Sequence, residues 1–192
     1  MSLIASDFIS LDGVVQAPGG PDEDTDDGFA HGGWSHPYFD VEAMGAAFDA
    51  TTKTTEALLF GRRTWQAMAA AWPAQAGDPF ADHMNSVLKY VVSNSLAADD
   101  LEWNNSHLLP GDDVAASVAA LKTKVEGDIH ILGSSQLVRY LVSHDLIDEF
   151  NLMIEPILLG GGKSIFPDDG VARGLELKDL TRASTGVLIA RY

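Results

Sequence analysis

Cysteine is absent from the 192-residue chain and basic residues are few. The missing thiols exclude disulfides, thiolate nucleophiles and zinc–thiolate sites. Only 12 Lys and Arg stand against 28 Asp and Glu, which gives a net charge of -16. Nucleic acids and anionic membranes are recognised by clustered positive charge, so neither is an expected partner. No apolar run reaches the roughly 20 residues that span a bilayer, and the amino terminus lacks a secretory signal pattern, so we expect a soluble cytoplasmic protein.

The acidic residues are concentrated near the amino terminus. No Lys or Arg precedes Lys53, whereas ten acids do. The densest stretch, 21–28, lies between glycine-rich pieces and is typical of a solvated loop. Its spacing does not fit a calcium-binding loop, so we predict no metal site. We expect one domain over residues 1–192, with this acidic loop inserted at about 16–37.

Alternating apolar strands and amphipathic helices predict an α/β domain. We expect the central strands of a mixed sheet to be parallel and the carboxyl-terminal edge to be antiparallel. The predicted strands are 3–10, 57–60, 88–92, 129–132 and 147–155, followed by a closing pair at 175–180 and 187–192. The predicted helices are 41–52 and three others that begin near Thr64, Asp113 and Ser135.

Three apolar strands end in small residues that lead into a polar turn or a helix. They end at Gly61, Ser93 and Gly133. Ligands of open α/β sheets bind outside the carboxyl ends of the strands, and a helix N-terminus offers free backbone N–H groups to a phosphate. The three turns together therefore favour a nucleotide site. Neither the usual dinucleotide fingerprint nor the triphosphate-binding loop is present, which argues against an ordinary Rossmann dehydrogenase or a kinase.

The order of several motifs resembles a known family over nearly the whole chain. These motifs are Ser10-Leu11-Asp12-Gly13, Leu59-Phe60-Gly61-Arg62-Arg63-Thr64-Trp65, Lys89 to Ser95, Ile131 to Ser135, and Glu155-Pro156 followed by Gly160-Gly161-Gly162. They are similar to those of the dihydrofolate reductase-like superfamily, in the branch related to the C-terminal reductase domain of bifunctional riboflavin biosynthesis enzymes. The resemblance implies a three-layer fold with a mixed, mostly parallel sheet.

The resemblance also implies a bound NADPH and a hydride transfer to a small, flat heterocyclic substrate. The cofactor would lie on three groups of residues: Gly61, Arg62, Arg63 and Thr64; Ser93, Asn94 and Ser95; and Gly133, Ser134, Ser135 and Gln136. Asp12 would face the substrate cleft. Asp40, at the start of the helix after the first loop, is a second catalytic candidate, and Glu155 is a further one.

Two departures from the family pattern bear on the activity. Leu132 stands where riboflavin-pathway reductases typically have Glu, and Asn94 stands where relatives often have an Arg for the 2′-phosphate. We therefore expect weak 5-amino-6-(5-phosphoribosylamino)uracil reductase activity, and NADH or FMN remain alternatives to NADPH unless Arg62 or Arg63 replaces the missing guanidinium. A nucleotide- or flavin-binding protein without turnover is the competing hypothesis. We expect a homodimer, with 150–154 as an apolar sheet edge.

Overall fold

A computed structural model describes residues 1–192, and the fold contains one eight-stranded sheet. The strand order is β4-β3-β2-β5-β1-β6-β8-β7. The strands are β1 (Leu3–Ser10), β2 (Thr55–Gly61), β3 (Leu88–Ser93), β4 (Ser106–Pro110), β5 (Asp128–Ile131), β6 (Glu149–Glu155), β7 (Asp179–Arg182) and β8 (Leu188–Arg191). The strands from β4 to β6 are parallel, and β8 runs antiparallel to both β6 and β7. The predicted mixed sheet with an antiparallel carboxyl-terminal edge is confirmed.

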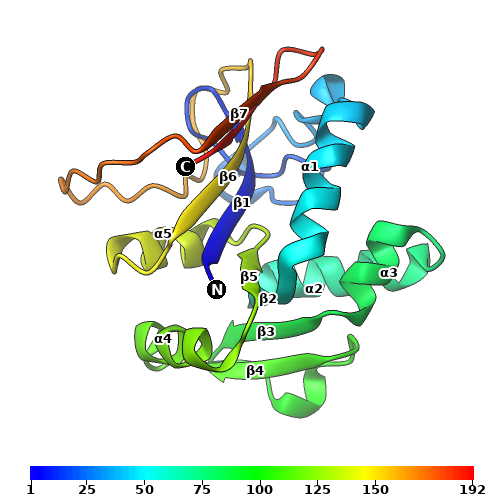
Figure 1. Ribbon diagram of the computed structural model, residues 1–192, viewed down its shortest axis with the longest axis vertical. Coiled ribbons are helices and arrows are strands. Elements are labelled where there is room, and N and C mark those ends of the chain that lie inside the picture. The colour runs from blue at the N-terminus through cyan, green and yellow to red at the C-terminus, as the bar shows by residue number, and fades with distance from the viewer.

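Helices cover both faces of the sheet and make a three-layer structure (Figure 1). Helices α1, α2 and α3 lie on one face, and α4 and α5 lie on the other. Their bounds are α1 (Val41–Thr54), α2 (Arg62–Ala71), α3 (Pro79–Ser86), α4 (Val114–Lys124) and α5 (Ser135–Ser143). The four predicted helices are confirmed, whereas α3 and β4 were not predicted. None of these helices combines the length and the apolar character needed to cross a membrane.

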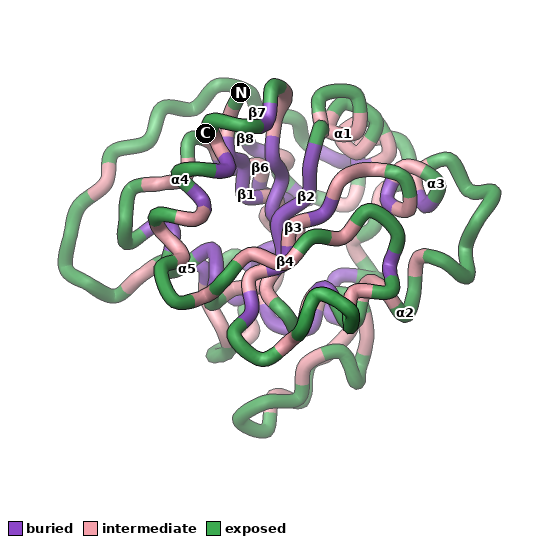
Figure 2. The backbone as a smooth tube through the Cα atoms, turned by 90° about the horizontal axis from the view of Figure 1, so that it is seen from below, coloured by how far each residue is buried: buried purple, intermediate pink, exposed green.

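The central strand β1 organises the core because it pairs with β5 on one side and β6 on the other. Leu3, Ala5 and Ile9 alternate along one face of the strand and are buried under α4 and α5. Burial is concentrated along the central strands, as Figure 2 shows. Asp7 occupies the same face as these apolar residues, since side chains two apart point the same way. One carboxyl group thus interrupts an otherwise apolar strand face.

The sheet edge differs from the predicted one. The segment 150–154 belongs to β6, which is enclosed between β1 and β8 and is not an edge. The expectation that it forms a homodimer contact is therefore wrong, because its backbone hydrogen bonds are already used within the chain. The edge strand at this end of the sheet is β7, which begins at Asp179, so residues 175–178 of the predicted strand are not part of it. The homodimer itself stays a prediction.

Candidate cofactor and substrate cleft

One large cleft, of about 1590 Å³, follows the sheet and includes the carboxyl ends of the parallel strands, although Asp128 and Glu149 at the starts of β5 and β6 also line it. Every residue that the resemblance assigns to the cofactor lines it, from the turns after β2, β3 and β5. These residues are Gly61, Arg62, Arg63, Thr64, Ser93, Asn94, Ser95, Gly133, Ser134, Ser135 and Gln136. Parallel strands bring their ends to one edge of the sheet, which is why segments far apart in the sequence meet here.

The turns after β2 and β5 are in direct contact. A Cβ atom on Gly61 would collide with Ser134 Oγ unless the serine side chain rotated away, so glycine favours this close approach. Gly133 has φ 78°, a left-handed conformation that favours glycine, and Ser134 follows with φ 76°. A non-glycine residue in this region is uncommon and is a feature of ligand-binding turns. The two turns therefore hold the starts of α2 and α5 side by side.

The starts of α2 and α5 differ from those of the other helices. Asp40, Asp78 and Asp113 cap α1, α3 and α4 with their side chains, whereas Gly61 and Ser134 make no side-chain cap. An uncapped helix start leaves backbone N–H groups free and carries the positive end of the helix dipole. Two such starts on one cleft supply the kind of unpaired backbone donors that anionic groups accept.

Basic side chains near these turns are of two kinds. Arg62 lines the cleft without an acidic partner, and its only side-chain contact is a 3.4 Å hydrogen bond to Gln66. Arg63 forms an ion pair with Asp26. Asn94 accepts a 2.7 Å hydrogen bond from the Gly111 N–H and thereby ties the end of β3 to the residue after β4. Arg62 is thus the guanidinium available to a ligand phosphate.

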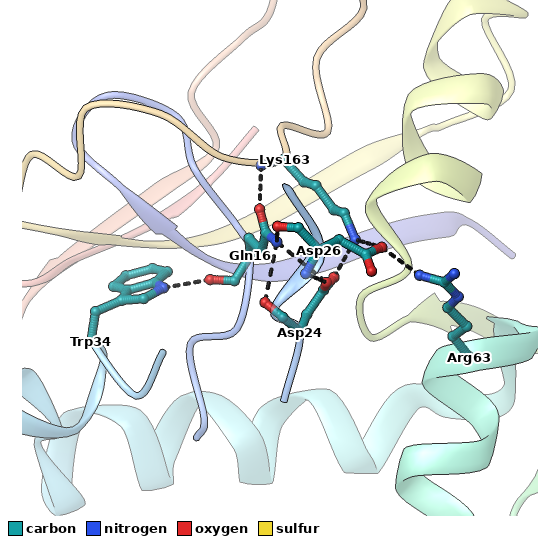
Figure 3. A network of polar contacts seen from close by, with 6 residues as sticks. All are labelled: Gln16, Asp24, Asp26, Trp34, Arg63 and Lys163. Carbon is teal, nitrogen blue, oxygen red and sulfur yellow. Dashed lines mark hydrogen bonds and ion pairs between the residues drawn. The ribbon is translucent and has the colours of Figure 1, made fainter. Parts of the chain in front are cut away.

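The acidic loop is folded against the cleft by a network that we call the acidic clasp, formed by Gln16, Asp24, Asp26, Arg63 and Lys163 (Figure 3). The Lys163 ammonium contacts both Asp24 and Asp26, the latter at 2.7 Å. The Gln16 amide donates to the backbone oxygens of Asp24 and Asp26 at 3.1 Å and accepts from the Lys163 N–H. Hydrogen bonds from Lys163, and then from Arg63, lower the pKa of Asp26. The loop 21–28 is largely exposed, as predicted, and four of its acidic residues also line the cleft.

Asp12 and Asp40 lie outside the residues that line the cleft. Asp12 accepts hydrogen bonds from the backbone N–H groups of Leu159 and Gly160 and from Ser10 Oγ, which lower its pKa. Asp40 caps α1 and accepts two hydrogen bonds from Ser184, and the Ser184 hydroxyl is the main reason that its pKa falls to about 2. Both carboxylates thus tie loops together, and the catalytic role of each stays a prediction.

Asp7 is the cleft residue that the motifs did not indicate. It lies in β1, is 9% exposed and lines the cleft, and its Oδ2 atom is buried with no hydrogen-bond partner. Burial raises its pKa to about 7. The signal was present in the sequence, because Asp7 is the only charged residue in Leu-Ile-Ala-Ser-Asp-Phe-Ile-Ser. A lone charge within a central strand is expensive to bury and therefore indicates a function.

Glu155 is a second buried carboxyl group, at the end of β6. It accepts a 2.6 Å hydrogen bond from Ser35 Oγ, and its Oε2 atom has no partner. Burial raises its pKa to about 7. Ser35 lines the cleft, but Glu155 itself does not. Through this hydrogen bond to Ser35, Glu155 anchors the end of the acidic loop to β6.

The fold and the cleft define an α/β protein of the kind that binds nucleotides at strand ends, and comparison with known proteins gives the family. The family model described as the RibD C-terminal domain matches residues 1–189, so the chain belongs to this family, which is of reductase type. The chain is similar to the uncharacterized protein YyaP of Bacillus subtilis (strain 168), with 28% identity over 142 residues, which cover 71% of this chain and 73% of that protein.

Two solved structures share the fold. A putative riboflavin biosynthesis protein from Shewanella sp. PV-4 matches with a TM-score of 0.73 and 20% identity, over 100% of this chain and 98% of that one. Dihydrofolate reductase from Enterococcus faecalis, complexed with NADP(H), matches with a TM-score of 0.56 and 16% identity, over 99% and 92% of the two chains. The fold is therefore dihydrofolate reductase-like, as the sequence predicted.

Proposed function

We propose that this protein is a reductase that transfers a hydride from NADPH or NADH to a small, flat heterocyclic substrate. The observation that carries the proposal is the pair of uncapped helix starts, α2 and α5, held in contact on one cleft at the strand ends. The membership of a reductase-type family and the fold shared with an NADP(H)-complexed reductase support the same cofactor class.

The residues of the cleft fit a dinucleotide. The free N–H groups at the start of α2 and of α5 would each hold one phosphate, and Gly133 would let the backbone approach without a side chain between. When bound, the nicotinamide ring would supply the hydride, while the protein orients it and excludes water. The acidic clasp would close one side of the cleft and so keep solvent from the reacting atoms.

The charges of the cleft favour a neutral or cationic substrate. The carboxyl groups that line it are those of Asp7, Asp22, Glu23, Asp24, Asp26, Asp78, Asp128, Glu149 and Asp179. The Lys and Arg side chains are only Arg62, Arg63, Lys163 and Arg191. Two of these four, Arg63 and Lys163, are already paired with Asp24 or Asp26. Such a field disfavours a phosphate on the substrate, away from the two helix starts whose free N–H groups would hold the cofactor phosphates, because a low-dielectric cleft concentrates it.

A binding titration tests the cofactor assignment. Wild-type protein is titrated with NADPH, NADH and FMN, and quenching of its four tryptophans is measured. Gly133→Val should weaken nicotinamide binding at least tenfold, because the side chain would occupy the space into which a phosphate must come. Gly170→Val is the matched control, since Gly170 has a similar φ of 71° but lies outside the cleft. Unchanged binding by a folded Gly133→Val variant would contradict the assignment.

Binding without turnover is the second candidate. Leu132, at the position where the family resemblance implies a Glu, lines the cleft as an apolar residue and gives no carboxylate to the reacting centre. Oxidation of NADPH, followed at 340 nm with a panel of neutral heterocycles, separates the two functions. Tight cofactor binding with no oxidation above the background rate for any of these compounds would favour the binding protein.

A further inference from the structure

The carboxyl group of Asp7 lies where the two uncapped helix starts meet. A Cβ atom placed on Gly133 would be 4.0 Å from Asp7 Oδ1 and 3.7 Å from Thr64 Cγ2. Thr64 belongs to the first turn of α2, and Gly133 leads into α5. One carboxyl group therefore lies beside the turn that leads into α5, near the first turn of α2.

Nothing in the protein satisfies this carboxyl group. It forms no ion pair, and Oδ2 is buried without a hydrogen bond. A buried polar atom without a partner costs on the order of 1–3 kcal/mol, so a group of this kind in a cleft is typical of a site whose partner is the ligand. An ionised carboxylate here would repel a pyrophosphate, whereas a protonated one offers an O–H donor to it.

We propose that Asp7 is a ligand of the bound dinucleotide and acts in its protonated form, donating a hydrogen bond to a phosphate oxygen. This inference rests on the proposed function and adds a consequence to it. Because burial raises the pKa of Asp7 to about 7, the carboxyl group is largely ionised above that pH and must take up a proton when the dinucleotide binds.

Other charged groups around Asp7 are engaged or point elsewhere. His130 of β5 bonds Ser6 Oγ at 3.2 Å on the opposite face of the sheet. Lys122 of α4 pairs with Asp148 near the other end of β1. The neighbour of Asp7 on β6 is Leu152, which is neutral. The remaining groups are Arg62 on α2 and the paired side chains of the acidic clasp, Asp24, Asp26, Arg63 and Lys163. Desolvation alone accounts for the shift of the Asp7 pKa.

The test compares NADH binding by wild type, Asp7→Asn and Asp7→Leu between pH 6 and pH 9. NADH is the probe because it lacks the 2′-phosphate, which itself titrates near pH 6. We expect the wild-type Kd to rise at least tenfold from pH 7 to pH 9, toward the limit of about tenfold per pH unit. Asparagine keeps a neutral donor, so Asp7→Asn should bind with a flat pH profile. Asp7→Leu should also be flat, but weaker than Asp7→Asn at every pH.

A matched control and a second measurement complete the experiment. Asp112→Asn removes an exposed carboxylate outside the cleft and should keep the wild-type profile. Calorimetric titration at pH 8 in two buffers of different ionisation enthalpy should show uptake of about one proton by wild type and none by Asp7→Asn. Equal pH profiles and equal proton uptake in wild type and Asp7→Asn would overturn this inference alone. Absence of nicotinamide binding by either protein at every pH would overturn the proposed function as well.

Discussion

Replacing Asp7 with Asn should make the protein more stable at alkaline pH, without any ligand present. Burial raises the pKa of Asp7 from 3.8 to about 7 in the folded state. The folded pKa lies above the unfolded one, so the stability associated with this group is fully present below pH 3.8 and is lost as the pH rises through 7. Asparagine resembles the protonated carboxyl group in shape but does not ionise, so its variant escapes this loss.

The size of the effect follows from the interval between the two pKa values. Each pH unit between them costs the wild-type folded state about 1.4 kcal/mol relative to the variant. From pH 5 to pH 8 the difference in unfolding free energy between Asp7→Asn and wild type should therefore grow by about 3 kcal/mol in favour of the variant. Other titrating groups are common to both proteins and cancel in the comparison.

Urea unfolding, followed by tryptophan fluorescence at several pH values, measures this difference directly. The exposed carboxylate of Asp22 provides the control, since Asp22→Asn should differ from wild type by a constant amount over the same range. A difference between Asp7→Asn and wild type that stays within about 0.5 kcal/mol from pH 5 to pH 8 would refute the reasoning. It would mean that Asp7 finds a partner or water in solution.

Three further predictions concern cofactor choice, substrate and loop stability. The Kd values of NADPH and NADH should lie within about a hundredfold of each other, which corresponds to about 2.7 kcal/mol of binding free energy. Any preference for NADPH should disappear in Arg62→Ala and persist in Arg63→Ala, because Arg63 is paired with Asp26. A preference above that limit in wild type would show that a phosphate clamp has been overlooked. Steady-state assay with 5-amino-6-(5-phosphoribosylamino)uracil and NADPH should give a kcat/KM below about 10⁴ M⁻¹s⁻¹, and a larger value would contradict the charge argument. Asp40→Ala should lower Tm by a few degrees through loss of the α1 cap and leave cofactor affinity unchanged, whereas a catalytic acid would lose turnover with Tm intact.

The sequence predicted the fold well because periodicity and strand-end glycines are local signals. Val138 and Leu141, for example, repeat at helical spacing and are buried in α5, as expected. Strand β4 was missed since it is short and contains Ser106, His107 and Pro110, none of which favours a strand. The edge was misplaced because β8 pairs with β6 through contacts between distant segments, which no local pattern reports.

The site was predicted in part, for a similar reason. Turn residues such as Gly61 and Gly133 are constrained by the backbone and are visible as motifs. Asp12 accepts a hydrogen bond from Gly160, and Asp40 accepts one from Ser184. Each partner is more than 140 residues away along the chain, so the sequence near the two carboxylates did not predict these bonds. Asp7 was not predicted as a site residue, because the apolar residues around it are enough to indicate a strand. Its charge, the only one in the strand, was the signal that could have identified it.

The close approach of Gly61 to Ser134 brings the starts of α2 and α5 near each other at the cleft. Because the turns that precede α2 and α5 lie close together, the free N–H groups of the two helix starts are near neighbours on the cleft. A dinucleotide has two linked phosphates and can occupy both positions with a single binding entropy cost, whereas a mononucleotide such as FMN fills one and leaves the other to water. We therefore expect a dinucleotide to bind this cleft more tightly than a mononucleotide does.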